Sequence, residues 1–97
     1  MLGEKLKEFR EAKGLLQRQV AVELDVDTAY ISKMENNDKP VSRNNLVKLA
    51  RLFDIKEELL FTYWLADKVF DILKNEEMGL KAIEIAEVEL KIKKKNK

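Results

Sequence analysis

The sequence contains no cysteine and no histidine, and it has only three glycines and one proline. Without cysteine or histidine, the chain cannot form a disulfide framework, a structural zinc site, or a Ser-His or Cys-His nucleophile pair. The scarcity of chain-breaking residues argues against a turn-rich sandwich or barrel. We therefore expect a protein that is not an enzyme and that holds no metal ion or other cofactor.

Long apolar runs are also missing, because no stretch approaches the roughly 18 residues that a bilayer-spanning helix needs. The first ten residues mix charges of both signs, which is not the pattern of a signal peptide. We therefore expect a soluble cytoplasmic protein with no membrane association.

The composition itself suits a compact helical protein. Of the 97 residues, 45% are hydrophobic and 38% are charged, which is too apolar for a disordered chain. The net charge is only +1, but residues 1–53 hold ten Lys/Arg against eight Asp/Glu, and residues 54–90 hold four against ten. The last seven residues hold five lysines and no acid. Any basic surface for nucleic acid must therefore be local.

Apolar spacing in the first half predicts four short helices. The first runs from Leu2 to Lys13 and stops at Gly14, and the second begins near Gln17. The third covers residues 28–35 behind Asp27, whose side chain can cap it. After a polar loop, Ser42 is expected to cap a fourth helix that ends near Phe53.

The second half differs in character, because its apolar stripes are wider than a single surface helix needs. Residues 56–75 form one predicted helix, and residues 76 to about 93 form another with two separate apolar stripes. Two stripes on one helix indicate two partners, one of them intermolecular. Residues 88–92 also alternate with period two and could form a strand, but the chain offers no partner strand, so a helix is favoured.

The densest functional signal lies in residues 17–37. Apolar side chains fall at the spacing of two short helices joined by a tight turn, and they are Val20, Leu24, Val26, Ile31 and Met34. A small residue, Ala21, stands where the second helix must cross closely over the first. This is the helix-turn-helix arrangement, whose second helix enters the DNA major groove.

On these residues the sequence resembles the phage-repressor and Cro-type helix-turn-helix regulators, the XRE family. The resemblance covers roughly residues 2–60, through LGEKLKEFREAKGLLQ, VAVELDV, YISKMENNDKP and LVKLARLFDI. It implies an all-α fold: a five-helix repressor-like DNA-binding domain in residues 1–60, with a C-terminal helical extension. The sequence departs at Asp25, where the family commonly has glycine, and in a slightly longer loop after Pro40.

A second resemblance lies in residues 61–93, around Trp64-Leu65-Ala66-Asp67-Lys68. These residues look similar to restriction-modification controller proteins, which typically act as dimers. We expect residues 61–93 to form a dimerisation extension, followed by a basic tail over residues 94–97. The candidate dimerisation residues are Trp64, Leu80, Ile83, Ile85 and Leu90. The alternative for Trp64 is a core position in the five-helix domain.

The family resemblance also places the candidate DNA contacts. Lys33 can donate to guanine, while Thr28 and Ala29 can offer methyl groups to thymine. Gln17, at the start of a helix, can bond a phosphate. The full candidate set is Gln17, Thr28, Ala29, Tyr30, Ser32, Lys33, Asn36, Lys39 and Arg43. The alternative interpretation for the helix positions is an ordinary solvated face, and for the loop positions ordinary loop polarity.

Arg10 and Glu35 receive a different interpretation. In the family these positions often form a partly buried ion pair that ties the first helix to the recognition helix. A bidentate guanidinium–carboxylate pair would set the angle of that helix without touching DNA. We interpret the pair as structural.

Together these observations predict a homodimeric transcriptional regulator that binds double-stranded DNA at a palindromic operator, in its sharper version a restriction-modification controller. One alternative is an antitoxin that binds a toxin protein and represses its own operon. Another is a protein-interaction module that has lost DNA contact, which the near-neutral charge and the bare Ala29 would fit.

Overall fold

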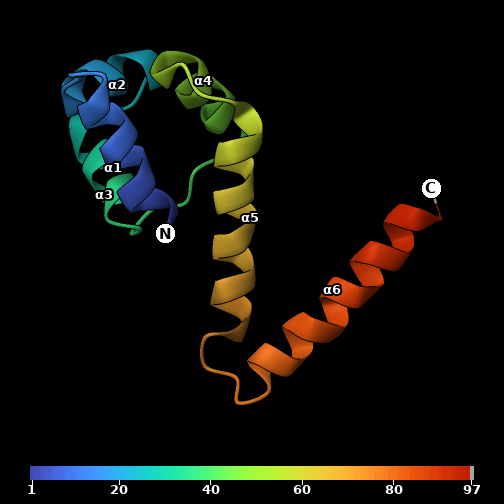
Figure 1. The fold of residues 1–97 in the computed structure, drawn as a ribbon. Coiled ribbons are helices and arrows are strands. Elements are labelled where there is room, and N and C mark those ends of the chain that lie inside the picture. The colour runs from blue at the N-terminus through green and yellow to red at the C-terminus, as the bar shows by residue number, and fades with distance from the viewer. Residues whose placement is uncertain (97) are drawn as a thin grey trace. The chain divides into compact units, whose positions relative to one another are not determined.

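The computed structural model describes residues 1–96, and all their regular structure is helical (Figure 1). The helices are α1 (Leu2–Ala12), α2 (Gln17–Leu24), α3 (Thr28–Glu35), α4 (Arg43–Phe53), α5 (Glu57–Leu73) and α6 (Gly79–Lys95). The predicted all-α class is confirmed, and residues 88–92 are helical. The last helix begins three residues later than expected, because residues 74–78 are not helical. None of the helices in the described residues combines the length and hydropathy that crossing a membrane requires.

The helix ends follow from local chemistry. The Asp27 carboxylate accepts a hydrogen bond from Tyr30 N at 2.8 Å, and the Ser42 hydroxyl accepts one from Asn45 N at 3.2 Å. These are the two caps that the sequence predicts for α3 and α4. Gly14 follows α1 at φ +68°, a left-handed conformation that glycine adopts without cost.

The chain divides into two compact units, Met1–Asp67 and a second unit that begins at Lys68. In the first unit, α1 to α4 and the beginning of α5 surround one hydrophobic core (Figure 1). The largest fully buried side chains of this core are Leu6, Val20, Ile31, Leu46, Leu49 and Leu60. Ala21 is also buried, where α2 packs on α3. The second unit contains the end of α5 and all of α6.

The division at Asp67 lies later in the chain than the boundary expected after residue 60. The reason is that α5 contributes more than Leu60 to the first unit. Trp64 Nε1 donates a hydrogen bond to the carbonyl of Val41 at 2.8 Å, and Asp67 accepts one from Leu2 N at 2.9 Å. These contacts join the middle of α5 to segments far away in the sequence.

Candidate nucleic-acid interface

The outer face of α3 is exposed, as a recognition helix requires. Thr28, Ala29 and Lys33 are exposed, while Ile31 and Met34 on the opposite face are buried in the core. This separation follows from the helical period, because residues three and four apart share a face. The three side chains predicted to reach base edges are therefore accessible together on one helix.

Tyr30 and Ser32 are only half-buried and lie at the margins of that face. The Tyr30 hydroxyl donates to the carbonyl of Pro40 at 3.3 Å, so it faces the loop that follows α3. This contact uses the one hydroxyl proton and leaves the oxygen as an acceptor. Because a phosphate needs a donor, this geometry suits Tyr30 as a support for the loop better than as a phosphate contact.

Arg10 and Glu35 form a bidentate ion pair between α1 and the end of α3. Arg10 Nε lies 2.6 Å from Glu35 Oε2, and Nη2 lies 3.2 Å from Oε1. Arg10 Nη1 also donates to the carbonyl of Leu15 at 2.8 Å. Both side chains are buried, with Arg10 9% and Glu35 6% exposed. The hydrogen bond to Glu35 raises the pKa of Arg10 against the opposing effect of burial.

Gln17 belongs to the same cluster. Its amide Nε2 donates to Glu35 Oε1 at 3.0 Å, and the side chain is half-buried. The sequence predicts a phosphate contact for this amide, whereas the structure directs it toward the buried carboxylate. The backbone N–H of Gln17 lies in the first turn of α2, where helix amides lack intrahelical partners. Any phosphate contact at this position would therefore come from the backbone or from the second amide proton.

Arg43 starts α4 and lies against two aromatic rings of α5. Its guanidinium carbon is 5.2 Å from the ring centre of Phe61 and 5.1 Å from that of Trp64. The two rings meet edge to face, with centroids 6.0 Å apart. Cation–π contact of this kind restricts a side chain that is otherwise flexible. Trp64 is therefore part of the packing of the first unit, which favours its alternative interpretation as a core residue over a role in dimerisation.

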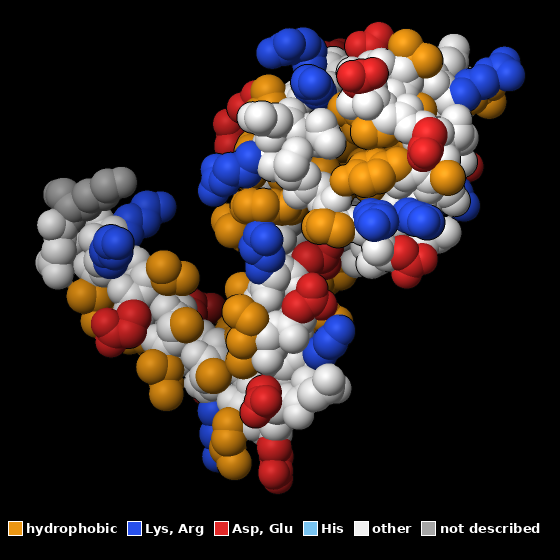
Figure 2. All heavy atoms as spheres, turned by 180° about the vertical axis from the view of Figure 1, so that it is seen from behind, with side chains coloured by type: hydrophobic (Ala, Val, Ile, Leu, Met, Phe, Trp, Pro, Cys, Tyr) orange, Lys and Arg blue, Asp and Glu red, His pale blue; other side chains and the backbone are white. Residues whose placement is uncertain are grey.

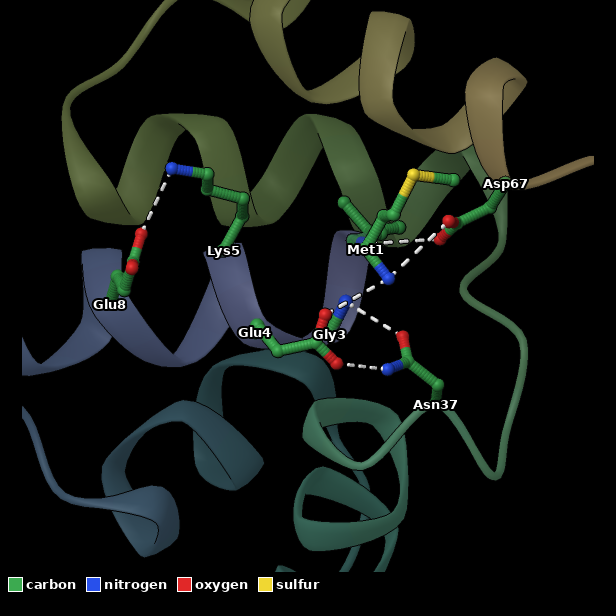
Figure 3. A network of polar contacts seen from close by, with 8 residues as sticks. Met1, Gly3, Glu4, Lys5, Glu8, Asn37 and Asp67 are labelled. Atoms are coloured by element: carbon green, nitrogen blue, oxygen red, sulfur yellow. Dashed lines mark hydrogen bonds and ion pairs between the residues drawn. The ribbon is translucent and has the colours of Figure 1, made fainter. Parts of the chain in front are cut away.

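The beginning of α1 is held by a polar network that no sequence pattern predicts (Figure 3). Gly3 N donates to Asn37 Oδ1 at 2.9 Å, and Asn37 Nδ2 donates to Glu4 Oε1. The α-amino group of Met1 lies 2.9 Å from Glu4 Oε2 and 3.4 Å from Asp67 Oδ1. Asn37 lies two residues after the end of α3 and has φ +63°, so the network ties the segment that follows α3 to α1.

The remaining candidate backbone contacts lie after α3. Asn36 and Lys39 are exposed in the loop between α3 and α4, and Arg43 is exposed at its end. Lys33 therefore lies before the loop between α3 and α4, and Lys39 lies within it. Within residues 1–96, no group of three or more acidic side chains is placed to hold a metal ion.

The candidate dimerisation residues Leu80, Ile83, Ile85 and Leu90 are all exposed on α6. Ile83 and Leu90 line a groove of about 430 Å³ within the second unit, whereas Leu80 and Ile85 lie outside it. The other lining residues are Val69, Ile72, Leu73, Ala82, Ala86 and Glu87. Figure 2 shows hydrophobic side chains at the surface along this unit. An open apolar groove of this kind indicates an interaction site.

Comparison with known proteins gives matches over the first unit. A family model described as helix-turn-helix matches residues 6–60. The regulator PrpR of Mycobacterium tuberculosis, an HTH-type transcriptional regulator, is 32% identical over 56 residues, which are 58% of this chain and 12% of PrpR. A propionyl-CoA carboxylase regulator of Cereibacter sphaeroides is 38% identical over 60 residues, 62% of this chain and 13% of that protein. The chain thus spans about an eighth of the length of these curated relatives.

The solved structures similar to the chain include the following two. The restriction-modification controller protein C.AhdI from Aeromonas hydrophila has a TM-score of 0.56 and 37% identity, over 61% of this chain and 86% of that one. A chain of the SinR protein/SinI protein complex also has a TM-score of 0.56, over 94% of this chain and 98% of that one. Its identity is 19%, so this second likeness concerns the fold alone.

Proposed function

The chain belongs to the helix-turn-helix family, and on that premise we propose that it is a sequence-specific regulator of transcription that binds double-stranded DNA. The observation that carries this proposal is the exposed outer face of α3, whose inner face is buried and whose end is braced by Arg10 and Glu35. A helix held rigidly in this way can present side chains to base edges in fixed register. Such a regulator acts where the chromosome lies, which in bacteria is the cytoplasm.

In this proposal Lys33, Thr28 and Ala29 read base edges, and Ser32 contacts a base or phosphate at the margin of the face. Asn36, Lys39 and Arg43 position the DNA backbone, together with the first-turn amides of α2. Arg43 suits this role because its contacts with the Phe61 and Trp64 rings restrict the side chain, while its N–H groups remain donors for a phosphate.

Selection of binding sites from a random duplex library tests this proposal. We expect a short sequence motif to be enriched, and affinity to fall steeply with salt because lysine and arginine contacts release counterions. Lys33→Ala should relax specificity at one base position by about 1–3 kcal/mol, with unchanged thermal stability. The matched control is Lys7→Ala, which removes the same charge from an exposed site on α1. Equal loss in both variants would show that Lys33 contributes only general charge.

We further propose that the protein acts as a homodimer on a palindromic operator, with residues 1–60 as the DNA-binding domain and the helical extension as the dimer interface. The open groove between Leu73 and Leu90 supports an intermolecular contact. A two-fold dimer would present two α3 helices to half-sites about 34 Å apart. The selected motif should therefore be an inverted repeat, and sedimentation should show a dimer at micromolar concentration.

The sharper version of the proposal is a restriction-modification controller, supported by the 37% identity to C.AhdI. The alternative is an antitoxin, in which the same groove holds a toxin protein instead of a second copy. A monomeric chain that forms a stable one-to-one complex with the product of a neighbouring gene would favour the antitoxin. A dimer whose selected motif occurs upstream of a methyltransferase gene would favour the controller.

A further inference from the structure

The charges of α6 and of the turn before it are divided between its two ends. Residues 76–87 carry four carboxylates and one lysine, a net charge of −3. Residues 88–96 carry one carboxylate and four lysines, a net charge of +3. Residues 76–96 are therefore neutral as a whole, but their negative and positive charges are separated along the chain.

Among the residues that the structure describes, the charges at the two ends have no ion-pair partners. Among residues 1–96, the one ion pair on this helix joins Lys91 Nζ to Glu87 Oε1 at 3.1 Å, near the middle. Glu76 and Glu77 at one end and Lys94 and Lys95 at the other are exposed and unpaired. Gly79 and Lys95 are about 24 Å apart at 1.5 Å per residue, well beyond the screening length of about 8 Å. The two ends of one helix therefore cannot neutralise each other.

The groove-lining face of α6 is centred on small residues. It runs from Ala82 to Leu90, and Ala86 lies at its midpoint. Alanine at Ala82 and Ala86 lets another helix approach this part of α6 closely. The apolar contact surface is therefore in the middle of the helix, with opposite charges at either end of it.

We propose that in the homodimer, α6 of one chain packs antiparallel to α6 of the second chain, with Ala86 close to the two-fold axis. This inference rests on the homodimer proposed above and adds its orientation. Lys95 and Glu77 lie equally far from Ala86 along the chain, so each basic end meets the acidic end of the second copy. A parallel pairing would place like charges together at both ends, which is unfavourable.

The helix dipole favours the same distribution of charges within a single chain, because carboxylates are stabilised at an N-terminus and lysines at a C-terminus. That effect is additive between the two ends and needs no second copy. If the helix dipole alone explained the charges, reversing them at both ends should therefore be more unfavourable than reversing them at one end. In an antiparallel dimer, reversing the charges at both ends should instead restore the attraction between the two chains. This difference separates the two explanations.

The first test measures the dimer dissociation constant by sedimentation equilibrium at low salt. Glu76→Gln with Glu77→Gln should weaken the dimer about three- to tenfold, since each exposed pair contributes modestly and symmetry doubles it. Glu76→Lys with Glu77→Lys, or Lys94→Glu with Lys95→Glu, should weaken it further. All four reversals in one chain should return the constant toward that of the unchanged protein.

The matched control is Glu57→Gln with Glu58→Gln, which removes the same two charges from two adjacent exposed glutamates at the start of α5. This control should leave the dissociation constant unchanged. Tighter association of the Glu76→Gln, Glu77→Gln variant would indicate a parallel pairing and overturn the inference. Failure of the fourfold reversal to restore association would also overturn it, in favour of the dipole explanation.

A second measurement does not depend on charge. The chain has no cysteine, so Lys95→Cys and Glu77→Cys each accept one spin label at an exposed site. An antiparallel dimer predicts label separations of about 25 Å or more in each variant alone, and a new short separation when the two are mixed. Short separations in the unmixed variants would overturn the antiparallel orientation while leaving the homodimer intact. A monomer at every concentration would instead refute the homodimer itself, and with it the orientation.

Discussion

Arg10 is the side chain through which α1, the turn before α2 and the end of α3 meet. Its guanidinium donates to Glu35 and to the Leu15 carbonyl, and Gln17 donates to the same carboxylate. Because both charges are buried, removing one of them leaves the other without its partner. The stability of the domain and the orientation of α3 are therefore coupled at this pair.

We expect Arg10→Ala to lower the free energy of unfolding by about 3–5 kcal/mol, since it leaves the buried Glu35 carboxylate without its counter-ion. DNA binding should weaken only through this loss of folded protein. Denaturant unfolding measures the first effect, and DNA titration at a temperature where the variant is folded measures the second. Lys5→Ala, which removes the surface Lys5–Glu8 pair and the contact of Lys5 with the Tyr63 ring, is the control and should have a much smaller effect. Lost DNA binding with full stability would contradict the structural role.

Gly3 and Gly14 suit their positions for different physical reasons. A Cβ on Gly3 would lie 2.6 Å from Asn37 Oδ1 and from the carbonyl oxygen of Glu35. A Cβ on Gly14 would meet no other atom within 4 Å, but Gly14 has φ +68°. In an exposed helix Gly→Ala stabilises by about 1 kcal/mol, yet we expect Gly3→Ala to destabilise by about 1–3 kcal/mol. Gly14→Asn should be nearly neutral because asparagine tolerates the left-handed region. Thermal unfolding of Gly3→Ala and Gly14→Asn measures the two stability changes. Equal changes in both variants would contradict this explanation.

Glu4 gives the first unit a dependence on acid pH. Hydrogen bonds from the Met1 amino group and from Asn37 lower the pKa of Glu4 below its ordinary value of 4.5. A carboxyl with a lowered pKa in the folded state contributes stability above its unfolded pKa, and that stability is lost as the pH falls through the folded pKa. Stability should therefore decrease below about pH 4.5. Glu4→Gln should show a shallower decrease when urea unfolding is compared across this range, and an identical pH profile would contradict the assignment.

At the scale of elements, the turn between α2 and α3 determines how the two motif helices cross. Asp25 ends α2 at φ 56° and ψ 48°, and Val26 N then donates to the carbonyl of Ala21 at 3.0 Å. This is the αL ending that glycine most often supplies, so aspartate holds it at some cost. Asp54 ends α4 in the same conformation.

We expect Asp25→Gly to stabilise the protein by about 0.5–1 kcal/mol, because glycine removes the Cβ penalty of the left-handed conformation. For a chain of this size, such a gain raises the Tm by roughly 2–8 °C. The specificity of DNA binding should not change, since Asp25 precedes the exposed face of α3. Asp25→Ala is the matched control, and it should lower the Tm. An increase in both variants would show that the aspartate charge, not the backbone conformation, is unfavourable.

At the scale of the whole molecule, the two units offer separate signals. The single tryptophan, Trp64, packs in the first unit, so its fluorescence reports on that unit, while the groove lies in the second. If the proposed homodimer forms through the groove, the Tm should rise with protein concentration, since association stabilises the folded state. The two units therefore permit dimerisation and folding of the DNA-binding part to be followed independently.

Leu90→Asp should abolish this dependence of Tm on concentration, because it places a charge in the apolar groove. Tryptophan emission of the folded protein should stay unchanged. Val88→Asp is the matched control, since Val88 is also exposed on α6, at 54% against 68% for Leu90, but does not line the groove. Calorimetry over a hundredfold range of concentration makes the comparison. A loss of the dependence in both variants would move the interface away from the groove.

Periodicity and capping residues predict the helices of the first half of the chain. Asp27 and Ser42 cap α3 and α4 because their oxygens satisfy nearby amides, a local interaction that the sequence determines by itself. The same periodicity separates the buried Ile31 and Met34 from the exposed Thr28, Ala29 and Lys33. The family and the outward face of α3 are therefore predictable from the amino-acid sequence alone.

Apart from the Arg10–Glu35 pair, which the family resemblance predicts, only the tertiary structure decided the contacts between segments that are distant in the chain. Gln17 turns to Glu35, Trp64 donates to Val41, and Asp67 caps α1, and no spacing within one helix encodes any of these. Each depends on which helices pack together and on where their backbone atoms come to lie. The helical period and the caps depend on residues a few positions apart, so the sequence predicts them. The long-range contacts form only after the core has brought distant segments together.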